Sequence, residues 1–226
     1  GDSIPSLVIE DSPEFGVRSL HLDLRCQKLR PDYLARYIAE LASYKINTVN
    51  FEWEDTFPFS RHPQVSGPYH YTREEVGRVI SACEANFITA VPLLQTIGHV
   101  EYILRNEACA DLREDHRDLS QYCLTNPDVL PFVRELIDEV AEAHPGPLFH
   151  MGGDETRLLG HCPRCAEFVT GSSQAELYAR HAAGVAEHIS AIGKTPVLWA
   201  DIATKHAEML PRLPDDIVFQ DWRYSY

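Results

Sequence analysis

Leu148-Phe149-His150-Met151-Gly152-Gly153-Asp154-Glu155 is the stretch around which the rest of the chain is organised. An apolar run leads into two glycines and then two adjacent carboxylates, which is typical of a buried strand that ends by presenting acids at a surface. Neighbouring carboxyls repel each other when both are ionised, so one acid and one carboxylate can form a catalytic pair. A solvated acidic loop after a strand is the alternative, and the surrounding sequence must decide between the two.

The composition limits the classes of protein that the chain can represent. It has 226 residues, 44% of them hydrophobic, which is enough for a single domain over residues 1–226. Acidic residues outnumber basic ones by 34 to 20, and the formal net charge of −14 argues against nucleic acid or an anionic membrane as a partner. No segment approaches the ~18 consecutive apolar residues of a membrane span. The first residues do not form a signal region, so a cytoplasmic location is favoured.

Alternating strands and helices run through the whole chain. Hydrophobic periodicity predicts strands at residues 19–24, 48–53, 88–95, 148–153, 196–200 and 217–220, and helices at 32–44, 72–86, 100–106, from 126, from 173 and at 204–210. Capping boxes open two of the helices, with Thr72 before Glu75 and Ser173 before Glu176. The helix that follows Asn126 is expected to start late because of a proline in its first turns. Such alternation predicts an α/β fold with a parallel sheet and crossover helices.

Two architectures have this alternation, an open doubly wound sheet and a (β/α)8 TIM-type barrel. No Gly-x-Gly-x-x-Gly follows the first strand, so a dinucleotide-binding sheet is not favoured. Polar and aromatic side chains gather directly after the strands, where a barrel builds its active site: Arg25, Glu54, His99, Asp154, Glu155, Asp201 and Tyr224. We therefore expect a barrel, here a partial one of about six β-α units. A closed barrel needs further strands, so we also expect the protein to continue beyond Tyr226.

Motifs at the ends of the expected strands carry a resemblance to a known family. His150-Met151-Gly152-Gly153-Asp154-Glu155 fits the signature His-x-Gly-Gly-Asp-Glu. Supporting motifs lie at residues 22–25, 53–58, 95–99, 199–201 and 222–224. From Arg18 to Tyr224 the chain resembles the catalytic domain of glycoside hydrolase family 20, the β-N-acetylhexosaminidases, and most closely the hexosaminidase D-like branch.

The resemblance implies an exo-acting retaining hydrolase without a cofactor. Such an enzyme removes a terminal β-linked N-acetylhexosamine, GlcNAc or GalNAc, from a glycan or glycoconjugate. Glu155 would be the general acid that protonates the leaving oxygen. Asp154 would orient the 2-acetamido group of the substrate, whose carbonyl oxygen attacks the anomeric carbon in place of a protein nucleophile.

The resemblance also implies a set of substrate-binding residues, namely Arg25, Glu54, His99, Trp199, Asp201, Trp222 and Tyr224. The guanidinium of Arg25 has five fixed donors for sugar hydroxyls, although a salt bridge to Asp23 or Glu54 is the alternative. Trp199 and Trp222 would form walls that stack on the apolar faces of the sugar and of its N-acetyl group.

The six cysteines are Cys26, Cys83, Cys109, Cys123, Cys162 and Cys165, too few for a dense disulfide scaffold in a chain of this length. Cys162 and Cys165 form a Cys-x-x-Cys motif after His161, which is half a zinc site that Cys109 or Cys123 would complete. Free thiols are favoured, and a disulfide and a structural zinc ion remain as alternatives. A thioredoxin-type redox role is not expected, because the motif is placed in a loop.

Two other functions are weighed against the hydrolase. One is a metal-dependent barrel hydrolase that uses His99, His150, Asp154 and Glu155. The other is a carbohydrate-binding barrel without catalysis, against which the intact acid pair argues. His150 lies inside its strand, so we interpret it mainly as a buried, hydrogen-bonded support for the two acids.

Overall fold

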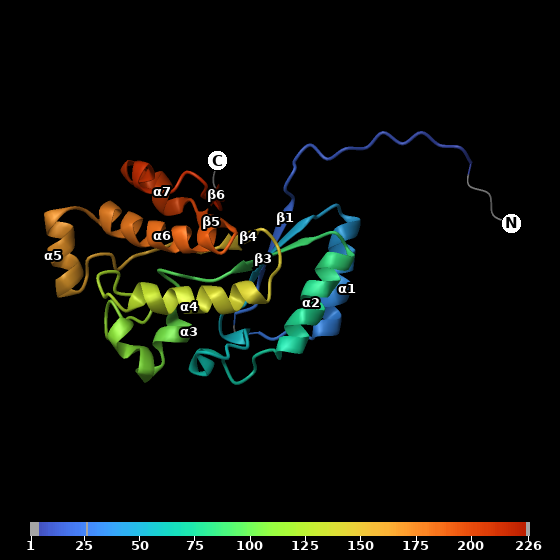
Figure 1. Cartoon of the computed structure of the whole chain (residues 1–226). Coiled ribbons are helices and arrows are strands. Elements are labelled where there is room, and N and C mark those ends of the chain that lie inside the picture. Colours follow the sequence, from blue (N-terminus) through green and yellow to red (C-terminus); the bar gives the residue numbers. More distant parts are fainter. Residues whose placement is uncertain (1–4, 26, 225–226) are drawn as a thin grey trace.

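The computed structural model describes residues 5–25 and 27–224, so Cys26 and Tyr226 lie outside the described part. Within it, six parallel strands form one sheet in the order in which they occur along the chain (Figure 1). They are β1 (Ser19–Asp23), β2 (Thr48–Glu52), β3 (Thr89–Leu93), β4 (Leu148–His150), β5 (Thr195–Trp199) and β6 (Val218–Gln220). Each strand lies where the sequence predicts it, which confirms the predicted α/β fold with a parallel sheet.

Helices separate the strands and pack against the sheet. They are α1 (Pro31–Ser43), α2 (Arg73–Ala85), α3 (Glu101–Leu104), α4 (Val129–Glu142), α5 (Pro163–Gly171), α6 (Gln174–Ala191) and α7 (Asp201–Lys205), with short 3₁₀ helices η1 (Glu54–Thr56), η2 (Pro63–Val65), η3 (Glu107–Leu112) and η4 (Ala207–Arg212). Helix α2 packs on β3 and α6 on β5, while α1 lies beside α2 and α4 beside α6 (Figure 1). None of the described helices combines the length and the apolar character needed to cross a membrane.

Local signals explain where the helices begin. The capping box of Thr72 and Glu75 forms in both directions at α2, and at α6 the Ser173 side chain accepts the Glu176 N–H. Helix α4 starts after Asp128, so Pro131 falls in its first turn, where a missing N–H costs nothing. The late start expected for this helix is therefore confirmed.

The sheet curls into part of a barrel. Asn50 in β2 donates a hydrogen bond from Nδ2 to Gln220 Oε1 in β6 at 3.1 Å. The ring centroids of His21 in β1 and Trp199 in β5 are 5.8 Å apart. Strands four places apart in an open sheet would be separated by ~19 Å, at ~4.8 Å per strand. These side chains meet across a concave interior, so the predicted partial barrel is confirmed.

Two local expectations need correction. Strand β4 ends at His150 and not at residue 153, because Gly152 and Gly153 take positive φ angles of 65° and 91° that turn the chain out of the sheet. The Cys-x-x-Cys motif does not lie in a loop, because Cys162 is the N-cap of α5 and Pro163 is its first residue. Proline at the first helical position is a helix-start signal that the sequence does contain.

Candidate active site

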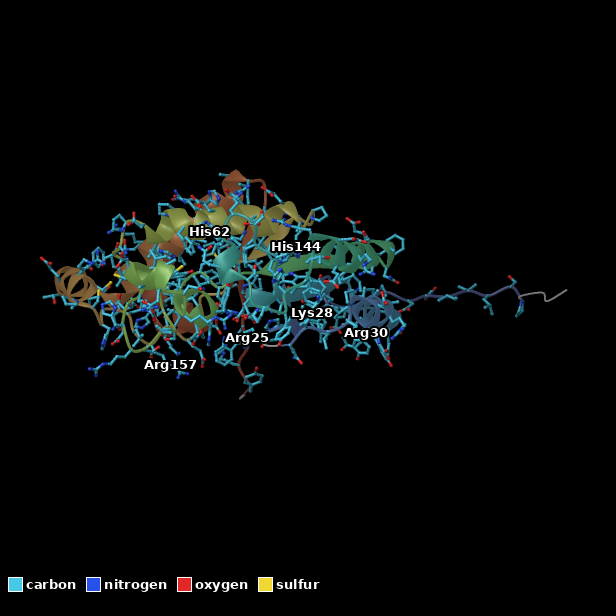
Figure 2. All side chains as sticks on the ribbon, turned by 90° about the horizontal axis from the view of Figure 1, so that it is seen from below. Arg25, Lys28, Arg30, His62, His144 and Arg157 are labelled. Atoms are coloured by element: carbon cyan, nitrogen blue, oxygen red, sulfur yellow. The ribbon has the colours of Figure 1, made fainter. Side chains whose placement is uncertain are left out.

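A cavity of about 400 Å³ opens at the carboxyl ends of the strands. Its lining comes from all six strands or from the loops directly after them: His21, Asp23, Arg25, Glu52, Gln95, His99, Asp154, Glu155, Trp199, Trp222 and Tyr224. Arg25 and Arg157, from the loops after β1 and β4, lie towards the same side of the molecule in Figure 2. Parallel strands bring their carboxyl ends to one rim, which is why residues distant in sequence converge there.

The two acids after β4 share one histidine. His99 Nε2 lies 3.5 Å from Asp154 Oδ2 and 3.5 Å from Glu155 Oε2. Gln95 donates from Nε2 to the other oxygen of Asp154 at 3.3 Å, and Arg157 donates from Nη2 to Glu155 Oε1 at 3.1 Å. Each carboxylate therefore has a second donor besides the histidine that both contact.

Several residues at the carboxyl ends of the strands have strained backbone conformations. Five described non-glycine residues have positive φ, and two of them, Lys45 and Phe87, follow helix ends, where this conformation is usual. The other three are Glu54, His99 and Glu155, with φ of 46°, 54° and 48°. Such conformations cost about 1–3 kcal/mol each and tend to occur at functional sites. The fold thus holds three of the expected site residues in unfavourable conformations.

The glycines before the acids let the chain pass close to its neighbours. A Cβ atom on Gly153 would lie 2.6 Å from Tyr178 Oη and 2.8 Å from Leu198 Cδ1. Tyr178 donates its hydroxyl hydrogen to the Gly153 carbonyl at 2.8 Å, and the Gly153 N–H donates to Gln95 Oε1 at 3.2 Å. This clamp places Asp154 and Glu155 on the cavity wall.

Burial and close contacts shift the pKa values of the acid and histidine side chains around the cavity. Burial alone would raise the pKa of Asp154, but the hydrogen bond and charge of His99 hold it below its usual value. That same contact raises the pKa of His99. Burial lowers the pKa of His150 to about 3, so its ring is neutral, and its Nδ1 accepts the Gly152 N–H at 3.0 Å. His150 is thus a buried support, as predicted, and it acts through the glycine backbone.

Arg25 and Glu54 form a second group beside the acids. Arg25 donates from Nε and Nη2 to Asp23 Oδ2 at 2.9 and 2.7 Å, and its Nε is 3.8 Å from Glu54 Oε1. The salt bridge to Asp23, considered as an alternative role for Arg25, is therefore present, although Arg25 also lines the cavity. Burial, together with the charge of Glu52, raises the pKa of Glu54 to about 9. Glu54 thus holds its proton at neutral pH.

Comparison with known proteins shows the family to which the chain belongs. The sequence profile of the glycosyl hydrolase family 20 catalytic domain matches residues 15–226. The chain belongs to glycosyl hydrolase family 20. It is 32% identical to hexosaminidase D of Bos taurus over 206 residues, covering 88% of this chain and 58% of that protein. It is 31% identical to hexosaminidase D of Homo sapiens over 214 residues, covering 91% of this chain and 42% of that protein.

Solved structures of family 20 proteins have the same fold. The X-ray structure of the Flavobacterium johnsoniae chitobiase aligns with a TM-score of 0.81 at 25% identity, covering 93% of this chain and 34% of that one. The β-N-acetylhexosaminidase of Bacteroides fragilis aligns with a TM-score of 0.79 at 25% identity, covering 94% and 46%. The chain spans about half the length of the curated hexosaminidase D relatives that it matches.

Most of the residues predicted for this family 20 site line the 400 Å³ cavity: Arg25, His99, Asp154, Glu155, Trp199, Trp222 and Tyr224. Two lie elsewhere. Glu54 lines a neighbouring cavity of about 710 Å³, which also contains Arg25 and His99. Asp201 is buried behind the site, where its Oδ2 accepts the Glu155 N–H at 3.2 Å. The structure thus places Asp201 against the backbone of Glu155, and its predicted substrate contact stays a prediction.

Several lining residues of the family 20 cavity were not predicted. His21 Nε2 lies 3.0 Å from Glu52 Oε2, and Gln95 Nε2 donates to Glu52 Oε1 at 2.9 Å. The missed signal is alternation, because His21 and Asp23 in β1, like Asn50 and Glu52 in β2, are polar at every second position. Polar residues on the inner face of a strand in a buried sheet mark a cavity.

The metal-dependent alternative requires His99, His150, Asp154 and Glu155 to converge as ligands. His150 is fully buried, and one of its ring nitrogens is already occupied by the Gly152 N–H. Among the described residues, the one group whose possible ligand atoms all lie within 4.8 Å of one another is elsewhere, at Glu114, Cys123, Cys162 and Cys165. Neither this geometry nor the family membership favours metal catalysis at the acid pair.

Proposed function

We propose that this chain carries the active site of an exo-acting retaining β-N-acetylhexosaminidase. It would remove a terminal β-linked GlcNAc or GalNAc residue from a glycan or glycoconjugate. The observation that carries the proposal is the acid pair, Asp154 and Glu155, on one wall of a cavity with His99 Nε2 3.5 Å from each carboxylate. The membership in family 20 and the hexosaminidase D relatives support the same substrate class.

Adjacent carboxylates suit a reaction in which the substrate supplies the nucleophile. Retaining enzymes with a protein nucleophile hold two carboxyls on opposite faces of the sugar, whereas consecutive residues of one loop lie on the same wall. In the proposed first step, Glu155 gives its proton to the glycosidic oxygen as the bond to the anomeric carbon breaks. The carbonyl oxygen of the 2-acetamido group attacks that carbon and forms an oxazoline-type intermediate.

In the second step, water attacks the anomeric carbon and gives a proton to Glu155. This opens the oxazoline ring, restores the acetamido group and releases the sugar with its configuration retained. Asp154 would accept the acetamido N–H and stabilise the positive charge of the intermediate. Its lowered pKa, for which the His99 contact offsets burial, fits a residue that must stay ionised.

The remaining lining residues would hold the sugar. Trp199 and Trp222 would stack on its apolar faces, and Trp222 Nε1 is a buried donor without a partner in the described structure. Arg25 and the protonated Glu54 would bind hydroxyls, because both can donate hydrogen bonds. The exposed side chain of Tyr224 would donate its hydroxyl to the acetamido oxygen.

The dependence of kcat/KM on the leaving group tests the role of Glu155. Glu155→Gln should lower kcat/KM by about 10²–10⁴-fold on natural or poorly activated glycosides and by much less on activated aryl N-acetylhexosaminides, because a good leaving group needs no proton. The measurement is hydrolysis of both substrate types by the two proteins. Glu187→Gln, the same change on the exposed side of α6, is the control and should behave as the wild type. Equal losses on both substrate types would contradict an acid role.

A further inference from the structure

Three thiols and one carboxylate converge between the loops after β3 and β4. Cys123 Sγ lies 3.5 Å from Cys162 Sγ and 3.7 Å from Cys165 Sγ. With an oxygen of Glu114, the four possible ligand atoms lie within 4.8 Å of one another. Helix α5 and the loop segment around α3 lie at the same end of the molecule in Figure 1. The fold thus brings together four residues that are spread over positions 114 to 165 of the sequence.

The spacing of the sulfurs is that of metal ligands. A disulfide has a bond of ~2.05 Å, and one disulfide would leave the third thiol unpaired. Around a tetrahedral zinc ion with Zn–S bonds of ~2.3 Å, the sulfurs lie ~3.8 Å apart. The separations of Cys123 from Cys162 and Cys165, 3.5 and 3.7 Å, are close to this value.

Glu114 supplies an oxygen that the protein leaves unsatisfied. Its side chain is 3% exposed, and its Oε1 accepts the Cys162 N–H at 2.7 Å. Its Oε2 is buried and has no hydrogen-bond partner in the described part of the chain. A buried carboxylate oxygen without a partner is costly, and a cation beside it would remove that cost.

The surroundings of the thiols donate hydrogen bonds to them. The Cys165 N–H donates to Cys162 Sγ at 3.3 Å, because Cys162 is the N-cap of α5. Arg164 Nη2 lies 3.6 Å from Cys123 Sγ, and Thr125 Oγ1 lies 3.2 Å from Cys165 Sγ. The Cys165 N–H and the Arg164 guanidinium are donors here, and such donors stabilise thiolates and orient metal ligands.

His161, the histidine of the motif, is engaged elsewhere. Its Nε2 pairs with Asp115 Oδ2 at 2.6 Å on the exposed side of the loop. A cavity of about 670 Å³ reaches Cys162 and Glu114 from this side and offers an entry path for an ion. Glu114, and not His161, is therefore the group that lies with the three thiols.

We propose that Cys123, Cys162, Cys165 and Glu114 bind a structural Zn²⁺ ion. Thiolates favour zinc over magnesium and calcium, and four protein ligands make a closed site that stabilises the fold and leaves no open position for catalysis. The ion joins the loop that carries His99 to the loop that carries the acid pair. These loops already meet where the Leu158 N–H donates to Gln121 Oε1 at 3.0 Å.

The metal content of the protein tests this site directly. Protein purified under reducing conditions and dialysed against metal-free buffer should retain about one zinc per chain by mass spectrometry. A mercurial thiol reagent should release the zinc as it reacts with the three thiols, and a metal-binding dye would follow the release. The cobalt-substituted protein should show the absorption of a tetrahedral, thiolate-bound Co²⁺ ion. None of these readouts depends on glycosidase activity.

Matched variants separate the site from other thiols. Cys162→Ser and Cys165→Ser should each bind less than about a tenth of the wild-type zinc and melt at a lower temperature. Cys83→Ala removes a fully buried thiol of α2 and should keep the full zinc content. Glu114→Gln preserves the side-chain volume and should weaken zinc binding about 10-fold or more.

Clear results would overturn the proposal. Wild-type protein that holds less than about a tenth of an equivalent of zinc, even after incubation with zinc under reducing conditions, has no such site. Protein without zinc in which peptide mapping of the unreduced chain finds two of Cys123, Cys162 and Cys165 joined has a disulfide there instead. Both readouts use the wild-type chain, so they decide the question even if a cysteine variant fails to fold.

Discussion

Glu54 is the residue whose burial has the clearest consequence for pH. Its pKa is raised to about 9 from an unfolded value of 4.5, mainly by burial and next by the charge of Glu52. The unfolded state therefore loses its proton first as the pH rises. The stability that protonated Glu54 contributes is complete below about pH 4.5 and is lost as the pH rises towards 9.

Glu54→Gln should remove this pH dependence. The variant should equal the wild type in free energy of unfolding near pH 4.5 and exceed it by about 2–3 kcal/mol at pH 7. Urea titrations at the two pH values would measure the difference, with Glu187→Gln as a surface control. A wild type that is as stable as the variant at pH 7 would contradict the raised pKa.

Asp154 is the residue that tests substrate assistance. Asp154→Asn should lower kcat/KM for 2-acetamido substrates by about 10²-fold or more, because the amide can no longer stabilise the charge of the intermediate. A thiazoline mimic of that intermediate should inhibit the wild type and bind the variant much more weakly. Inhibition constants of the two proteins would measure this. A wild type that is indifferent to the thiazoline would rule the mechanism out.

Single residues were predictable where they follow a strand and belong to a motif. His99 and Trp222 were found in this way. Trp199, the last residue of β5, was found through its motif, and all three line the cavity. Glu52 was not, because it lies within its strand, where an isolated polar residue has many possible roles. The contact of Asp201 with the Glu155 N–H depends on the positive φ of Glu155, which no sequence pattern predicts.

At the scale of elements, the end of β4 is the most constrained part of the site. Gly153 has φ of 91°, and a Cβ atom there would overlap Tyr178 and Leu198. Gly153→Ala should therefore lower the free energy of unfolding by about 2–4 kcal/mol and abolish most activity. Gly77→Ala in the exposed middle of α2, where nothing lies within 4 Å, should raise it by about 0.5–1 kcal/mol. Urea unfolding of both variants compares them, and a stable, active Gly153→Ala protein would refute the clamp.

The elements themselves were largely predictable because their signals are local. The apolar spacing of Leu34, Ile38 and Leu41 predicted the buried face of α1, and all three are buried. Helix α5 was missed because cysteine is an unusual N-cap, although Pro163 supplied a start signal. The length of β4 could not be predicted, because its end is set by contacts with Tyr178 and Gln95 from other elements.

At the scale of the whole molecule, the curvature of the sheet unites the six strand ends into one cavity. The contact of Asn50 with Gln220 across the interior depends on twist and tilt, which strand spacing does not encode. The alternation of elements left an open sheet possible, and the rim residues with their motifs favoured the barrel. The structure settles the question through contacts between strands that are four places apart.

The charge of the whole molecule predicts a preference among substrates. The formal net charge is −14, and the cavity is lined by Asp23, Glu52, Asp154 and Glu155 against one arginine, Arg25. A sulfated or otherwise anionic N-acetylhexosaminide should therefore associate more slowly than its neutral counterpart.

The salt dependence separates this repulsion from a steric effect. The screening length falls from ~30 Å at 0.01 M salt to ~8 Å at 0.15 M, so the ratio of kcat/KM for a 6-sulfated over a neutral aryl N-acetylglucosaminide should rise with salt. The neutral substrate serves as the control, because its kcat/KM should stay nearly constant. A ratio that does not change with salt would mean that contacts inside the cavity, and not the field of the molecule, decide which substrates it accepts.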